Sequence, residues 1–115
     1  MLEDSENRLY QRHAEMCKVF ASPTRLAIIN SLREGELNVG DLAKRLRVAK
    51  ANLSQHLAVM RGQGILVTRK DGNHVFYRVA NPKLLQACDL LREILIEQIR
   101  AESALVGSAR RSRRA

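Results

Sequence analysis

Residues 49–64, AKANLSQHLAVMRGQG, place hydrogen-bonding side chains along one side of a predicted helix. Leu53, Leu57 and Met60 recur at helical spacing and predict a narrow buried seam. The remaining positions carry amide, hydroxyl, imidazole and basic groups, which complement the base edges and phosphates of DNA. We therefore interpret this segment as a helix that contacts DNA. Its expected DNA-binding residues are Lys50, Asn52, Ser54, Gln55, His56 and Arg61.

These side chains suit different parts of a DNA duplex. Asn52 and Gln55 carry amides that can pair bidentately with adenine, whereas Lys50 and Ser54 suit phosphates. Two interpretations of His56 fit the sequence. It either contacts a phosphate, or it is packed or bonded to the backbone beside Leu57.

The charge distribution favours a polyanionic partner. The chain has a formal net charge of +8. Residues 42–78 contain eight basic residues and a single acid, Asp71. Four more basic residues lie in the C-terminal tail: Arg110, Arg111, Arg113 and Arg114. Such segregation predicts a binding face for nucleic acid, with a solvated basic surface as the alternative.

Composition limits the class of protein. With 115 residues, 45% hydrophobic and only 3% aromatic, the chain predicts one mainly helical domain with an aliphatic core. No apolar run approaches the roughly 20 residues that span a bilayer, and the acidic first residues do not resemble a secretory signal. We expect a cytoplasmic protein with reduced cysteines and no membrane partner.

The elements before the DNA-contacting helix form a helical scaffold. A first helix is expected over about residues 5–21, and Ser22 and Pro23 are typical of the start of a second. Leu26, Ile29 and Leu32 are its expected buried stripe, and Gly35 ends it. Asn38 caps a short third helix, with Leu42 and Leu46 facing inward, and the four residues RVAK separate it from the fourth. This spacing is typical of a helix-turn-helix.

A hairpin follows the fourth helix. The segments ILVTRK and HVFYRV alternate around DGN, a strong signal for a tight β-turn. The hairpin would form a wing beside the helix-turn-helix. Its tip residues are expected to contact flanking phosphates or the minor groove of DNA: Arg69, Lys70, Asn73 and His74.

The last helix, from Asn81 and Pro82 to about Leu105, is too apolar for the surface of so small a domain. We expect it to pack with the first helix and to form a homodimer through both. The predicted organisation is a winged helix-turn-helix of five helices with a small β-hairpin wing. It would comprise a DNA-binding and dimerisation domain over residues 1–106 and a basic disordered tail over residues 107–115.

Two stretches of the sequence resemble those of a known protein family. FASPTRLAIINSLREGELNVGDLAKRL and LSQHLAVMRGQGILVTRKDGNHVFYRV resemble the ArsR/SmtB family of bacterial metal- and redox-responsive repressors, over roughly residues 16–95. The resemblance implies a dimeric repressor that leaves its operator when an inducer binds. It also implies that Gln55 points into the DNA groove. Ala49 departs from the family, which often has Ser or Thr at the start of this helix.

The metal sites of the family are not matched here. Where the family places cysteines in an ELCVCDL-like segment, this chain has Asn38 and Gly40. Where the last helix of the family begins with Asp-x-His, this chain reads Asn81-Pro82-Lys83. We therefore assign no metal and no cofactor from the resemblance.

Cys17 and Cys88, on the first and last helices, leave three hypotheses for sensing. Both can be core residues. Alternatively, reactive sulfur or an oxidant joins them, which for a disulfide requires Cα atoms roughly 4.4–6.8 Å apart. In the third hypothesis His13, which is four residues before Cys17, completes a metal or arsenite site with the two thiols.

Other functional classes fit less well. The chain has no CxxC motif, no glycine-rich phosphate loop and no Ser–His–carboxylate pattern, so an enzyme is not expected. A winged-helix module that binds an acidic protein remains an alternative to double-stranded operator DNA. Asn52 and Gln55 discriminate between the two partners, because only base recognition needs their amides.

Overall fold

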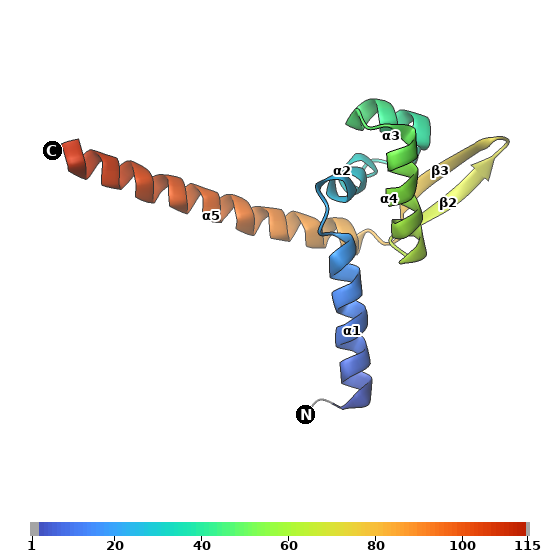
Figure 1. Cartoon of the computed structure of the whole chain (residues 1–115), viewed down its shortest axis with the longest axis horizontal. Helices are drawn as coiled ribbons and strands as arrows, with labels where there is room; N and C mark the ends of the chain where they lie inside the picture. Colours follow the sequence, from blue (N-terminus) through green and yellow to red (C-terminus); the bar gives the residue numbers. More distant parts are fainter. Residues whose placement is uncertain (1–2, 115) are drawn as a thin grey trace.

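Two long helices extend from a small winged body in the computed structural model, which describes residues 3–114 (Figure 1). In chain order the elements are α1 (Asp4–Val19), α2 (Pro23–Ser31), β1 (Leu37–Asn38), α3 (Val39–Leu46), α4 (Lys50–Gly62), β2 (Leu66–Asp71), β3 (His74–Val79) and α5 (Lys83–Arg114). The body comprises α2, α3, α4 and the sheet. The five helices and the wing confirm the predicted winged helix-turn-helix.

Local chemistry explains where the body helices begin. The Ser22 hydroxyl accepts a hydrogen bond from the Arg25 backbone N–H, with Pro23 in the first turn of α2. Asn38 Oδ1 accepts from the Asp41 N–H at 2.8 Å at the start of α3. Arg47 ends α3 in the left-handed conformation, with a φ of 55°. Ala49 occupies the N-cap of α4 without a side-chain hydrogen bond, because its methyl group has no acceptor atom.

The sheet contains one strand more than the sequence predicted. Its order is β1-β3-β2, and both pairings are antiparallel. Asp71 pairs with His74 across the hairpin turn, where Gly72 adopts the positive φ of 60° that glycine tolerates. The short strand β1 pairs Leu37 with Tyr77 and fastens the base of the wing to the start of α3.

The core is aliphatic, as the composition predicts. The buried hydrophobic residues are Val19, Ile28, Ile29, Leu32, Leu42, Leu53, Leu57, Met60, Ile65 and Leu66. Leu53, Leu57 and Met60 are fully buried, which confirms the seam predicted for α4. Leu26 was expected in the buried stripe of α2 but is 44% exposed, and Leu46 is only half-buried. Leu26 faces the space between α1 and α5 rather than the core.

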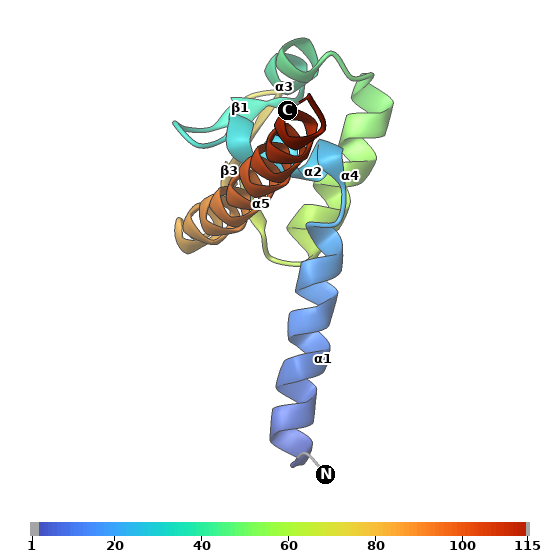
Figure 2. The ribbon, with the colours of Figure 1, turned by 90° about the vertical axis from the view of Figure 1, so that its left-hand side faces the viewer.

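The helices α1 and α5 diverge from the body instead of packing along each other (Figures 1 and 2). Within the described protomer the two helices therefore do not pair along their lengths, and the expected homodimer through both stays a prediction. Large hydrophobic side chains stay exposed on both: Leu9, Tyr10, Met16, Leu90, Leu91, Ile94, Leu95, Ile96, Ile99, Leu105 and Val106. A single protomer thus leaves much apolar surface uncovered.

The end of α5 also differs from the expectation. The helix continues to Arg114, so residues 107–114 are helical rather than disordered; Ala115 lies outside the described residues. Alanine and arginine are good helix formers, and this segment contains both. Across residues 3–114, no helix combines the length and the apolar character needed to cross a membrane.

Candidate nucleic-acid interface

The helix α4 presents most of its predicted DNA-binding residues to solvent. Lys50, Asn52, Ser54 and Gln55 are exposed in its first two turns, and Arg61 is exposed in the last. The buried seam fixes this orientation, because a helix turns by about 100° per residue and so separates the two faces. The exposed face therefore offers amide, hydroxyl and ammonium groups from one rigid element.

His56 differs from its neighbours because its imidazole contacts another helix. The Arg25 Nε–H donates to His56 Nδ1 at 3.1 Å, and both side chains are half-buried. Neither of the two interpretations from the sequence included this side-chain partner. Arg25 was not singled out from the sequence, since no local pattern links residues 31 positions apart.

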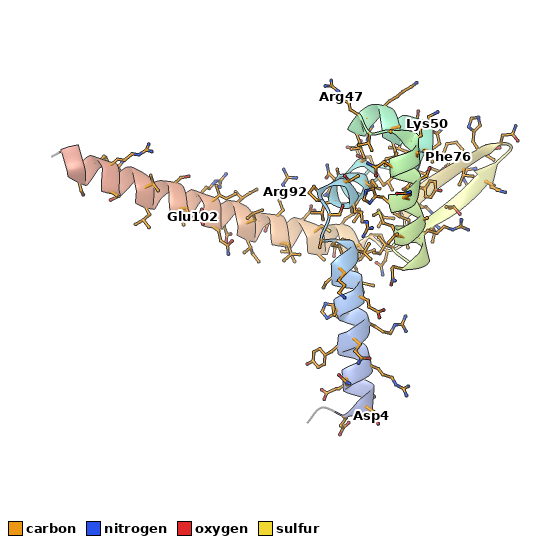
Figure 3. The ribbon with its side chains drawn as sticks, in the orientation of Figure 1. Asp4, Arg47, Lys50, Phe76, Arg92 and Glu102 are labelled. Atoms are coloured by element: carbon orange, nitrogen blue, oxygen red, sulfur yellow. The ribbon has the colours of Figure 1, made fainter. Side chains whose placement is uncertain are left out.

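The wing tip lies beside the beginning of α4. A cleft of about 650 Å³ separates them, and it is lined by Lys44, Lys50, Asn73 and His74 among others. The predicted contacts Lys50, Asn73 and His74 are thus brought together, with Lys44 of α3 as an addition. Figure 3 shows Arg47 and Lys50 at the end of the body opposite to Asp4 of α1. Arg47 and Lys50 therefore lie far from the free end of α1.

Arg69 is the one wing residue with a carboxylate partner among those predicted from the sequence. Its Nε and Nη2 donate to the carboxylate of Glu36, with Nε 3.1 Å from either oxygen. The guanidinium also lies over the Phe76 ring, 4.8 Å from its centroid. This ion pair lowers the pKa of Glu36, chiefly through the hydrogen bond from Arg69. Arg69 therefore fastens β2 to the segment before β1, whereas Lys70 is exposed next to it.

This difference predicts unequal effects of two neighbouring substitutions on DNA binding. Lys70→Ala should lower the dependence of log affinity on log salt by about 0.9 per protomer, the value for one lost phosphate contact. Arg69→Ala should lower it by less, because Glu36 already neutralises that charge. Titrations of random duplex DNA at several salt concentrations measure both slopes. An equal or larger change for Arg69→Ala would show that Arg69 leaves Glu36 for a phosphate.

The opposite side of the molecule carries an apolar groove. The groove has a volume of about 830 Å³ and lies between α1, α2 and the first half of α5. His13, Cys17 and Cys88 all line it. In the part of the chain that the structure describes, however, no three His, Cys, Asp or Glu side chains gather closely enough to hold a metal ion. The hypothesis of a metal site at these three residues thus lacks support within one protomer.

The two thiols have different surroundings. Cys17 is exposed on α1, whereas Cys88 is half-buried on α5. Burial raises the pKa of the Cys88 thiol, and the neighbouring Asp89 carboxylate raises it further. Asp89 itself accepts two hydrogen bonds from Arg33, at 2.9 and 2.6 Å. This bidentate pair fastens the first turns of α5 to the end of α2.

Comparison with known proteins identifies the family of this chain. Residues 22–68 match the family described as bacterial regulatory protein, arsR family. The chain is also 35% identical over 96 residues to the biofilm growth-associated repressor of Xylella fastidiosa, covering 84% of this chain and 83% of the relative. The chain belongs to the arsR family. This confirms the resemblance found in the sequence.

Two solved structures are similar to this chain in fold. Reduced HlyU from Vibrio cholerae is 32% identical, covers 80% of this chain with 97% of its own, and has a TM-score of 0.70. The homodimeric winged helix-turn-helix DNA-binding domain Mb0332 from Mycobacterium bovis reaches a TM-score of 0.79 at 23% identity, with coverages of 87% and 93%. The family match and the relative named a repressor make this chain a transcriptional regulator of the arsR family rather than an enzyme. That result favours DNA over an acidic protein as the partner of the basic face.

Proposed function

We propose that this regulator is a homodimeric repressor that acts in the cytoplasm. It binds a double-stranded palindromic operator and releases it when reactive sulfur or an oxidant acts on Cys17 and Cys88. One observation carries the proposal: both cysteines line the same uncovered apolar groove, so that a covalent change there alters dimer packing. The Xylella relative is named a repressor, which supports the direction of regulation.

The uncovered apolar surface supports a dimer. A second copy of the chain offers the same groove-lining hydrophobic side chains of α1 and α5, among them Met16, Leu91 and Leu95, and a two-fold axis brings like surfaces together. Each Å² of apolar surface removed from water contributes about 25 cal/mol of favourable free energy, so burial of these two faces favours dimerisation. The Mycobacterium bovis domain with this fold is described as homodimeric, consistent with the same assembly here.

In the proposed complex, α4 of each protomer enters the major groove. Asn52 and Gln55 recognise bases, and Lys50, Ser54 and Arg61 contact phosphates near them. The wing follows the flanking DNA through Arg69, Lys70, Asn73 and His74, with Arg69 in the weaker role that its pairing with Glu36 implies. Two recognition helices related by the dimer axis would require half-sites about one helical turn, near 34 Å, apart.

The sensing chemistry balances with a polysulfide as the oxidant. The Cys17 thiolate attacks the terminal sulfur of the polysulfide. A Cys17 persulfide forms as the S–S bond of the polysulfide breaks, and a shorter polysulfide leaves with the electron pair. The Cys88 thiolate then attacks the Cys17 persulfide, forming the Cys17–Cys88 disulfide and releasing hydrosulfide. The first attack falls to Cys17 because it is the exposed thiol of the protomer. A relative, the Vibrio cholerae HlyU, has been described in an explicitly reduced form, which is consistent with redox-sensitive thiols.

The environment of Cys88 predicts the pH dependence of its reactivity. Because the pKa of Cys88 is raised, its thiolate forms at higher pH than that of a free cysteine. The rate of alkylation should therefore increase only at correspondingly higher pH. The rate of iodoacetamide modification, measured against pH in a Cys17→Ser variant, gives the midpoint. Asp89→Asn should move the midpoint to lower pH, since it removes one of the two causes. A Cys88 midpoint at or below that of free cysteine, in the Cys17→Ser protein with Asp89 intact, would contradict this environment.

The proposed switch is tested with DNA from upstream of the gene that encodes this protein. Fluorescence anisotropy compares reduced and polysulfide-treated protein, with Cys17→Ser and Cys88→Ser as matched controls. Treatment should weaken binding by at least about tenfold in the wild type, within the usual range of allosteric coupling, and leave both variants unchanged. Tight binding in both states of the wild type would overturn the switch and return the cysteines to a packing role.

A further inference from the structure

The hydrogen bond between Arg25 and His56 joins the start of α2 to the recognition helix α4. The Arg25 Nε–H donates to His56 Nδ1 at 3.1 Å. A ring nitrogen that accepts a hydrogen bond carries no proton, so neutral His56 has its proton on Nε2. The guanidinium therefore selects the tautomer and the ring orientation of His56.

The pair has hydrogen-bond donors to spare. Nε of Arg25 is used by His56, and no residue within 3–114 accepts from the two terminal Nη groups or from Nε2 of His56. No carboxylate forms a salt bridge with Arg25 in that part of the chain either. The pair thus combines one net positive charge with several N–H donors, which is the chemistry that recognises a phosphate oxygen.

The position of the pair distinguishes a phosphate from a base. His56 lies on α4 between the buried seam of Leu53 and Leu57 and the exposed position of Gln55. When a helix enters the major groove, its outermost face meets the base edges and its flanks meet the sugar-phosphate backbone. The flank of α4 that carries His56 is also the one that Arg25 contacts.

We propose that Arg25 and His56 together bind one backbone phosphate of the DNA at the flank of α4. Arg25 contributes its terminal guanidinium nitrogens and holds the imidazole so that Nε2–H donates to the same phosphate. This inference rests on the proposed mode of DNA binding and adds Arg25, an α2 residue, to the interface. It also gives His56 a definite role as an oriented donor.

The affinity test uses fluorescein-labelled random-sequence duplex DNA, because a phosphate contact does not depend on sequence. Arg25→Ala should weaken binding by about tenfold per protomer, the size of a lost charge-assisted hydrogen bond. It should also lower the salt slope by about 0.9 per protomer, or about 1.8 per dimer. Arg12→Ala, an exposed arginine on α1, is the matched control and should change neither quantity.

Two further variants separate this role from a merely structural one. The double variant Arg25→Ala/His56→Ala should bind about as weakly as Arg25→Ala alone, because the two side chains act on one phosphate. Arg25→Lys keeps the charge, and so the salt slope, but lacks the planar fork and should lose affinity. Nitrogen NMR of the imidazole should report the Nε2–H tautomer in the wild type and a tautomer mixture in Arg25→Ala.

Several results would overturn the inference. An Arg25→Ala protein with wild-type affinity and slope would do so, as would a loss of affinity with an unchanged slope. If Arg25→Ala does not fold, as judged by thermal unfolding, full wild-type affinity of Arg25→Lys and His56→Ala would overturn it equally. Wild-type protein without any salt-dependent DNA binding would instead contradict the proposed function itself.

Discussion

Aspartates at Leu91 and Leu95 should convert the protein to a monomer and weaken operator binding by about a hundredfold or more. A dimer holds two half-sites at once, so losing one recognition helix removes its whole share of the binding free energy. Both leucines line the apolar groove on α5, and they are 68% and 52% exposed in the protomer. Their replacement therefore introduces negative charges into the apolar interface between two copies, which opposes dimerisation. The core of each copy stays intact because both positions are exposed.

The same helix offers a matched control. Leu90 and Ile94 are 60% and 50% exposed, close to the values for Leu91 and Leu95, but they do not line the groove. Leu90→Asp/Ile94→Asp should leave the dimer and its operator affinity much closer to wild type. Sedimentation analysis gives the oligomeric state of each variant, and anisotropy gives its affinity. If both pairs behave alike, the groove is not the site of dimerisation.

Alanine at Asn52 or Gln55 should remove most of the preference for operator over random DNA. A bidentate amide–base pair contributes about 1–3 kcal/mol of discrimination, so each substitution should reduce the affinity ratio by about tenfold to a hundredfold. Both residues are exposed, so the fold of α4 does not depend on their amides. The salt slope on random DNA should stay at the wild-type value, because neither side chain carries charge.

Gln63→Ala is the control for this experiment. Gln63 is an exposed amide of the same type at the C-terminal end of α4. Competition titrations with operator and random duplexes measure the ratio for all three variants. If Gln55→Ala keeps its full sequence preference while Gln63→Ala loses it, bases are recognised at the C-terminal end of α4. That result would contradict the proposed role of Gln55.

The elements that the sequence predicted well are those with strong local signals. The seam of Leu53, Leu57 and Met60 repeats at helical spacing, and Gly72 marks the hairpin turn. The strand β1 was missed because two residues are too few to show alternation. The tail over residues 107–115 was expected to be disordered because it is short, polar and basic, yet the helix propensity of residues 107–114 continues α5.

The candidate site was predicted only as far as local patterns extend. The exposed face of α4 follows from its period, whereas the Arg25–His56 and Arg69–Glu36 contacts join residues 31 and 33 positions apart. Leu26 shows the same limit for packing. Its spacing predicted that Leu26 shares one face of α2 with other apolar residues. It did not predict whether this side chain packs in the core or lines the groove.

The central claim is that this protein binds a particular DNA sequence through α4 and the wing. The most direct test titrates reduced wild-type protein against the upstream duplex of its own gene and against a duplex of shuffled sequence. We predict preference for the upstream duplex by at least about a thousandfold, the lower end for specific regulators, with affinity that falls steeply as salt increases. Equal affinity for the two duplexes across the salt range would contradict sequence-specific recognition of this upstream region. Absence of binding to either would contradict the DNA-binding interface as a whole.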